Sequence, residues 1–240
     1  MILPRRYIYL IITYIAMHFS SLLAIPFIPF LDESQLAYFS IYWQVGAFLV
    51  AFIIMLFILK REMKDFFALD NKRVGSLAFW SIIGFILAMI TQVVAAFIQT
   101  FVLKIQPGSE NTFEIMAMAR QVPLLIIVIT IIGPILEELV FRKAIFGSLY
   151  KKMNFFFAGL LSSFIFAIVH MDFSHILVYT AVGFVFAFLY IETKRIIVPI
   201  IAHAGMNTFA VVVQLSTDPE EIEEQMRLLE QLQSIIIGGF

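Results

Sequence analysis

Two carboxylates and a guanidinium interrupt an otherwise apolar stretch of the chain. The stretch reads Gly133-Pro134-Ile-Leu-Glu137-Glu138-Leu-Val-Phe-Arg142. On a helix, Glu138 and Arg142 stand four residues apart on one face, so we expect them to form a structural ion pair. Glu137 points about 100° away from Glu138 and is left as a free carboxylate, a type of group that can act as a general base. Gly133-Pro134 removes a backbone bond and is expected to loosen this helix and turn it toward the bundle interior.

Two further apolar stretches carry imidazoles and a carboxamide. One ends Phe166-Ala-Ile-Val-His170, and the other contains His203-Ala-Gly-Met-Asn207, whose two polar residues share a helical face. Polar groups in a membrane span are expensive and usually mark function. We therefore interpret Glu137, His170, His203 and Asn207 as one catalytic constellation assembled from three helices.

The other histidines have a structural interpretation. His18 stands alone in an apolar stretch, where hydrogen bonding to a backbone carbonyl is the favoured role, and His175 near a helix end is interpreted in the same way. The chain has no cysteine, which excludes disulfides, thiolate metal sites and a cysteine nucleophile.

Composition indicates the elements that must position these groups. Of the 240 residues, 62% are hydrophobic and only 14% are charged, which is far more apolar than a soluble domain. A membrane span needs about 20 apolar residues, and seven stretches approach this. They are residues 7–30, 41–59, 77–103, 122–146, 155–169, 176–191 and 196–215. The predicted fold is an all-α polytopic transmembrane bundle of seven spans, with eight as the alternative.

Charge predicts the orientation of this bundle in a cell membrane. If the N-terminus is cytoplasmic and seven spans alternate, every Lys and Arg except Lys104, Arg120 and Arg227 falls on the inner side. The C-terminus is then outside. We expect one transmembrane domain over residues 1–217, with its motif-bearing core at 122–213, and an acidic amphipathic tail over 218–240.

The order of the motifs resembles a known family. Glu137-Glu138-xxx-Arg142, then Phe166-xxx-His170, then His203-xxx-Asn207, all within hydrophobic spans, are similar to the three motifs of the CPBP family of intramembrane proteases (CAAX proteases and bacteriocin-processing enzymes, also called Abi). Family members commonly have Gly after the motif arginine, where this chain has Lys143. The resemblance covers roughly the second half of the chain.

The resemblance implies hydrolysis of a peptide bond in a membrane-associated or hydrophobic substrate. Candidate substrates are leader peptides, pheromone or bacteriocin precursors, and CAAX-like tails. The residues suit such chemistry, because Glu137 could activate water while Asn207 and one histidine donate to the developing oxyanion. A zinc ion held by Glu137, His170 and His203 is the alternative. The chain lacks a His-Glu-x-x-His signature, so spacing leaves both mechanisms open.

Two other functions compete with proteolysis. Members of the family are also associated with bacteriocin immunity and with membrane sensor kinases, so a non-catalytic partner role is the first alternative. The intact motif set weighs against it. A proton-coupled transporter ranks third, because we find no internal repeat. The near-neutral charge argues against a nucleic-acid partner, which leaves the lipid bilayer and a peptide substrate as expected partners.

Overall fold

The fold is an all-helical polytopic bundle. The computed structural model describes residues 4–61, 71–106, 108–218 and 227–228. Within these ranges six helical segments are long and apolar enough to span a membrane, and one shorter apolar helix accompanies them. The six are Arg5–Phe30, Glu33–Leu59, Val74–Val102, Leu124–Leu149, Phe173–Thr193 and Ile197–Ser216, and the shorter one is Phe155–Val169. The chain is therefore a multi-pass membrane protein, with the segments expected from hydropathy. The acidic tail expected at 218–240 lies almost wholly outside the described residues.

The first two segments meet in a turn rich in proline. Helix α1 (Arg5–His18) continues as two short 3-10 turns, Phe19–Leu23 and Ile25–Phe30, the second of which contains Pro29. Helix α2 (Glu33–Leu59) begins earlier than the predicted residue 41. Its start is fixed by a capping box, in which Asp32 Oδ1 accepts from the Gln35 backbone N–H at 2.8 Å and Gln35 Oε1 accepts from the Asp32 N–H at 3.1 Å.

The remaining helices surround a central span. Helix α4 (Asn71–Phe97) ends in a π-helical turn, Ile98–Val102, and α9 (Phe155–Val169), α10 (Ile176–Thr193) and α11 (Ile197–Ser216) follow the central span in the chain. The central span is Leu124–Leu149, and 61% of its apolar window is buried, against 17–33% in the other five. The glutamates and the arginine of the first motif therefore lie on the most enclosed helix of the bundle.

The central span alternates between α and π geometry. It runs through α6 (Leu124–Ile127), a π segment at Val128–Ile132, α7 (Gly133–Glu137), a second π segment at Glu138–Phe146 and α8 (Gly147–Leu149). In a π-helix the N–H of residue i+5 bonds the carbonyl of residue i. For Ile129 that residue is Pro134, which has no N–H. The Ile129 carbonyl instead accepts a hydrogen bond from Asn207 Nδ2 on α11, at 3.0 Å.

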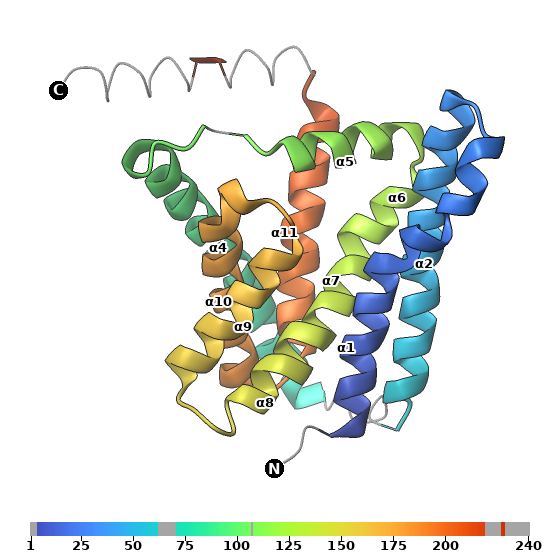
Figure 1. The fold of residues 1–240 in the computed structure, drawn as a ribbon. Helices are drawn as coiled ribbons and strands as arrows, with labels where there is room; N and C mark the ends of the chain where they lie inside the picture. Colours follow the sequence, from blue (N-terminus) through green and yellow to red (C-terminus); the bar gives the residue numbers. More distant parts are fainter. Residues whose placement is uncertain (1–3, 62–70, 107, 219–226, 229–240) are drawn as a thin grey trace.

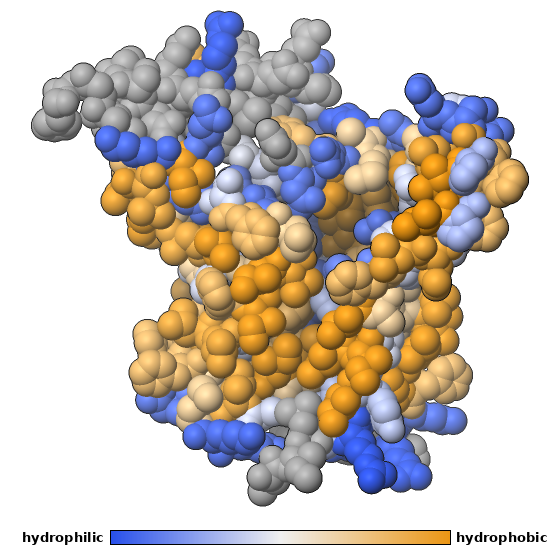
Figure 2. Space-filling view, viewed as in Figure 1, coloured by the Kyte–Doolittle hydropathy of each residue, from blue (hydrophilic) through white to orange (hydrophobic). Residues whose placement is uncertain are grey.

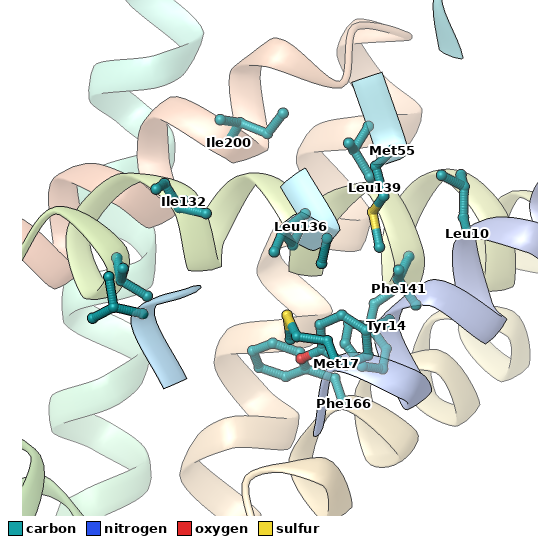
Figure 3. Packing of buried hydrophobic residues seen from close by; sticks show 14 of the residues in the cluster. Leu10, Tyr14, Met17, Met55, Ile132, Leu136, Leu139, Phe141, Phe166 and Ile200 are labelled. Carbon is teal, nitrogen blue, oxygen red and sulfur yellow. The ribbon is translucent and has the colours of Figure 1, made fainter. Parts of the chain in front are cut away.

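Apolar packing holds this span against its neighbours. The core joins α1, α2, α9 and the central span, and Figure 3 shows Tyr14 and Met17 of α1 beside Phe141 and Phe166. The Tyr14 ring meets the Phe141 ring edge-on at 5.4 Å, and Phe141 meets Phe166 at 5.2 Å. Such contacts fix the rotation of the central helix and hence the direction of its polar side chains. The face drawn in Figure 2 is mainly apolar across its middle and polar toward both ends, as a membrane protein requires.

One helix was absent from the sequence-based prediction. Helix α5 (Glu110–Gln121) begins at Ser109, whose Oγ accepts from the Thr112 N–H at 3.1 Å. It is too short and too polar to span a membrane, and in Figure 1 it runs across the upper end of the bundle. The hydropathy pattern predicted no span here, because α5 is amphipathic and covers other helices instead of facing lipid.

Candidate active site

The four residues of the predicted constellation line a single cavity. This cavity has a volume of about 440 Å³ and is bounded by Glu137, Phe166, His170, His203 and Asn207, together with residues of α2, α4, α5 and α10. Its polar lining includes Ser109 just before α5, Asn111 and Thr112 of α5, and Gln214 near the end of α11, which places the mouth at the upper end of the bundle. Figure 2 shows the molecule hollowed in its upper half. The convergence that spacing made feasible is therefore present in the fold.

Glu137 and His203 face one another in the cavity. Glu137 Oε2 lies 3.6 Å from His203 Nε2, and the Glu137 side chain keeps 15% of its surface accessible while that of His203 keeps 3%. Glu137 can thus meet a small molecule such as water inside the cavity. Gly133, one turn earlier, also lines the cavity, and a Cβ there would lie 3.9 Å from Glu137 Oε1 and 3.1 Å from the Val128 carbonyl oxygen.

His203 contacts a buried ion pair formed by Glu138 and Arg142. His203 Nδ1 donates to Glu138 Oε1 at 3.1 Å, and the other oxygen of Glu138 lies 3.2 Å from Arg142 Nε. Glu138 and Arg142 are wholly inaccessible, which makes this an ion pair shielded from solvent. A carboxylate on one imidazole nitrogen fixes the orientation of the ring. Sequence spacing paired Glu138 with Arg142 but gave no sign that Glu138 also holds His203.

Aromatic rings enclose these charged groups. The Arg142 guanidinium carbon lies 4.7 Å from the Phe166 ring centroid and 5.6 Å from that of Phe186. Its Nη atoms have no hydrogen-bond acceptor among the described residues, so the ring faces are their electrostatic partners. Phe186 also stacks on the His203 ring at 4.7 Å. The phenylalanine of the second motif therefore belongs to the wall that holds the arginine of the first.

His170 has one nitrogen engaged and one available. Its Nδ1 lies 2.8 Å from the Phe166 carbonyl oxygen. Since a carbonyl only accepts, Nδ1 carries the proton, and in the neutral ring Nε2 is an acceptor. The ring stacks on Tyr179 at 4.3 Å with an interplanar angle of 30°. No feature of the sequence singled out Tyr179, one of eight tyrosines in an apolar chain.

Asn207 serves the fold and the cavity together. Its Nδ2 donates one hydrogen to the Ile129 carbonyl. A carboxamide nitrogen carries two hydrogens, so a second remains for a group within the cavity. Asn207 can therefore donate to a substrate oxygen from a nitrogen whose position is already fixed.

Within the described residues, the candidate catalytic side chains do not group as a zinc site. The sequence alternative placed zinc on Glu137, His170 and His203. Within the described residues, no three His, Asp or Glu side chains lie close enough together to hold a metal ion. This side-chain arrangement does not match the three-ligand zinc set.

The remaining histidines lie outside the constellation. His18 Nδ1 contacts the Tyr14 carbonyl oxygen at 3.0 Å, the backbone bond expected for it. His175 differs from expectation, because its Nδ1 lies 3.0 Å from Asp172 Oδ1 and not against a carbonyl. Ser109 Oγ donates to the other oxygen, Asp172 Oδ2, at 2.7 Å. Serine and histidine both bind the aspartate here, so this trio lacks the serine-to-histidine contact of a nucleophilic triad.

The Asp172 carboxyl is held in its charged form. Partial burial alone would raise its pKa, but the hydrogen bonds from Ser109 and His175 outweigh burial and lower the pKa of Asp172 below its ordinary value. The trio is therefore a polar junction between the start of α5 and the connection from α9 to α10.

Comparison with known proteins identifies relatives of this chain. Residues 119–209 match the family model described as type II CAAX prenyl endopeptidase Rce1-like. The chain is 45% identical to YdiL of Bacillus subtilis (strain 168), named as a candidate membrane peptidase, over 98% of both chains. It is 38% identical to the membrane-embedded CAAX protease MroQ of Staphylococcus aureus (strain USA300), over 89% of this chain and 90% of that one. No solved structure matches the chain.

Proposed function

Since the chain belongs to the Rce1-like type II CAAX prenyl endopeptidase (CPBP) family of membrane proteases, we propose that it is an intramembrane endopeptidase in which Glu137 activates the attacking water. One observation carries the proposal. Glu137 presents an accessible carboxylate to an enclosed cavity, 3.6 Å from a histidine that Glu138 holds in place. A positioned carboxylate in a cavity of low polarity is suited to general-base catalysis.

The proposed reaction assigns one task to each group. Glu137 takes a proton from water, and the hydroxide attacks the carbonyl carbon of the scissile peptide bond. Asn207 Nδ2 donates its second hydrogen to the developing oxyanion. Glu137 then returns the proton to the amide nitrogen as the C–N bond breaks, which releases a carboxylic acid and an amine. His170 Nε2 accepts a hydrogen bond from the water and orients it. His203 is an ion-pair partner for Glu137 when both of its ring nitrogens carry protons.

A metal-free reaction is the version that the side chains support. Glu137, His170 and His203 are not grouped as a three-ligand site within the described residues. A chelator should therefore leave cleavage unchanged. Loss of activity with the chelator, and its return on adding Zn²⁺, would replace the Glu-activated water with a zinc-bound one.

The orientation in the membrane determines which side the substrate comes from. Pairs of basic residues lie at the end of the bundle where α1 begins, in the first turn of α1 and in the connections between spans (Figure 1). They are Arg5 and Arg6, Lys60 and Arg61, Lys151 and Lys152, and Lys194 and Arg195. The positive-inside rule favours a cytoplasmic location for this end, and with it a cytoplasmic N-terminus and an external C-terminus. The cavity mouth beneath α5 then faces the outside of the cell.

This orientation narrows the substrate class. Apart from Glu137 and three histidines, the described residues that line the cavity are uncharged, and most are apolar. An uncharged, apolar peptide segment therefore suits the cavity. Leader, pheromone or bacteriocin-precursor peptides that reach the outer face fit both criteria, whereas a CAAX-like tail on the cytoplasmic side would have to cross the membrane first.

Cleavage by the purified protein tests the proposal. The protein in detergent is incubated with labelled leader and pheromone-precursor peptides, with and without a chelator. Glu137→Gln and His203→Ala should abolish cleavage, while Glu192→Gln, an exposed glutamate at the end of α10, should retain it. If Glu137→Gln cleaves like the wild type, the catalytic assignment fails. If that variant also preserves the cellular phenotype, a non-catalytic role in immunity or sensor-kinase regulation takes its place.

A further inference from the structure

Three glutamines of the apolar spans line the cavity. They are Gln44 of α2, Gln92 of α4 and Gln214 of α11. Within the described part of the chain, none of the three carboxamides has a hydrogen-bond partner. Arg120 does bond to Gln214, but at the backbone carbonyl oxygen. An unpartnered amide in apolar surroundings is costly, so the three side chains are suited to bind polar groups of a molecule that enters the cavity.

Two of these glutamines lie above the proposed oxyanion donor, toward the cavity mouth. Helices α4 and α11 both end at the upper end of the bundle (Figure 1). On α11, Gln214 follows Asn207 by seven residues, which on a helix is two turns along one face, or about 10 Å. On α4, Gln92 follows Phe85 by seven residues, and the Phe85 ring packs against that of Phe209 on α11 at 6.2 Å. Since Gln214 follows Phe209 by five residues, the two glutamines lie at a similar height.

The third glutamine stands at a comparable level on α2. Helix α2 and the central span both run downward from the upper end of the bundle (Figure 1). Phe48 of α2 lies beside Gly133 of the central span, where a Cβ would come within 3.9 Å of Phe48 Cε1. Gln44 is one turn above Phe48. Glu137 is one turn below Gly133, so about 11 Å along the bundle separates Gln44 from Glu137. The three glutamines therefore form a level of carboxamides on three helices, above the groups proposed to carry the reaction.

A carboxamide offers the hydrogen bonds that a peptide backbone needs. It combines N–H donors with a carbonyl acceptor, as a peptide group does. A helical substrate pairs these backbone groups internally, whereas an extended substrate leaves them unpaired, at a cost in an apolar cavity. Partners on the cavity wall remove that cost. An extended chain advances about 3.3 Å per residue, so the carboxamide level meets the substrate about three residues from the scissile bond.

We propose that Gln44, Gln92 and Gln214 form a backbone-binding subsite that holds the substrate in an extended conformation on its way to Glu137. The proposal rests on the proposed function, because it takes Glu137 and Asn207 as the place where the peptide bond is cut. The occupant is the main chain of an unwound apolar peptide, whose N–H and carbonyl groups bond to the carboxamides. Because the subsite binds the main chain, apolar segments of different sequence are accepted. A segment that stays helical gains nothing from it.

Binding of a defined peptide tests the subsite without relying on cleavage. The probe is a fluorescently labelled peptide of alternating valine and alanine with lysines at both ends, which favours an extended chain. It is bound to the full-length protein in detergent, in the Glu137→Gln background. Gln44→Met, Gln92→Met and Gln214→Met each remove the carboxamide and keep a side chain of similar length, and each should raise Kd about two- to tenfold. Gln121→Met makes the same change on an exposed glutamine at the end of α5, outside the cavity lining, and should leave Kd unchanged.

A second peptide separates backbone recognition from packing. In it, the amides of the valine-alanine segment are replaced by esters, which removes the N–H donors and keeps the side chains. For this ester peptide, the loss of affinity in each glutamine variant should be much smaller. Equal losses for the two peptides would assign the effect to packing and overturn the proposal, as would an unchanged Kd in all three variants.

Cleavage of the leader and pheromone-precursor peptides is scored separately from binding. Weakened binding in the glutamine variants, together with normal cleavage by Glu137→Gln, would refute the proposed function and leave the subsite in place. Unchanged binding in those variants, with cleavage lost in Glu137→Gln, would refute the subsite and leave the proposed function.

Discussion

His203 Nδ1 lies 3.1 Å from Glu138 Oε1, across 65 positions of sequence and two helices. Through this bond the second glutamate of the motif contacts a histidine that lines the cavity, without lining the cavity itself. One oxygen of Glu138 orients His203, and the other neutralises Arg142. The stability of the fold should therefore depend on the contact of this carboxylate with Arg142, and catalytic activity on its contact with His203.

Glu138→Gln is expected to destabilise the protein strongly. It leaves the Arg142 charge buried without a counter-ion, and breaking a buried pair in this way costs about 3–5 kcal/mol. Thermal unfolding in detergent measures the loss. In the double variant Glu138→Gln/Arg142→Met the orphaned charge is gone, so much of the stability should return while activity stays low, because no carboxylate orients His203. Recovery of activity together with stability would contradict the orienting role.

Asn207→Ala should reduce catalysis more than stability. Removing an oxyanion donor typically lowers kcat by about 10²–10³-fold, while the freed Ile129 carbonyl costs about 1–3 kcal/mol of folding free energy. Both are measured on one preparation, by peptide cleavage and by thermal unfolding. The neighbouring Thr208→Ala removes an exposed hydroxyl bonded to Ala204 of the same helix and should leave kcat unchanged. A kcat for Asn207→Ala within twofold of the wild type would remove Asn207 from the reaction.

Adjacent serines on α9 offer a matched test of the second π segment. Ser162 Oγ donates to the Phe141 carbonyl at 2.7 Å, whereas buried Ser163 Oγ has no hydrogen-bond partner among the described residues. Ser162→Ala should cost about 0.5–1.5 kcal/mol, because it removes a buried hydrogen bond to the π segment. Ser163→Ala should be neutral or stabilising, because it removes an unsatisfied hydroxyl. Equal unfolding midpoints for the two variants would mean that this bond does not support the π segment.

The Asp172 junction should make stability depend on acidity. Its pKa in the folded protein lies below the ordinary value of 3.8, so the unfolded chain binds the proton more readily. The carboxylate therefore stabilises the fold fully above about pH 4, and this contribution is lost as the pH falls through the lower, folded pKa. The unfolding midpoint of Asp172→Asn should lie below that of the wild type at pH 6, and the gap should narrow toward pH 3. A gap that is constant over this range would assign it to packing and not to charge.

Hydropathy and motif spacing predicted much of this molecule, because both report local properties. The apolar stretches became the helices of the bundle, and Glu138 with Arg142 follows from the helical repeat. The contacts of His203 with Glu138 and of Tyr179 with His170 join separate segments, and no periodicity in the sequence encodes them. Helix α5 was not predicted, because it covers the end of the bundle with an amphipathic helix that lacks the continuous apolar run of a span. The sequence also did not predict the two π segments of the central span. Their Ile129 and Phe141 carbonyl oxygens accept hydrogen bonds from Asn207 and Ser162 on other helices.

The pairing of Pro134 with Asn207 has a consequence for how this protein can change over evolutionary time. Pro134 leaves the Ile129 carbonyl without a backbone donor, and Asn207 supplies one. In a lineage that no longer needs catalysis, loss of the asparagine would still cost stability, because the proline leaves the Ile129 carbonyl dependent on it. Replacing Pro134 first by a residue with a backbone N–H would give the Ile129 carbonyl a donor. Substitution of Asn207 would then cost less stability. Related chains should therefore show the two positions varying together, with the proline lost before the asparagine in members that have abandoned proteolysis.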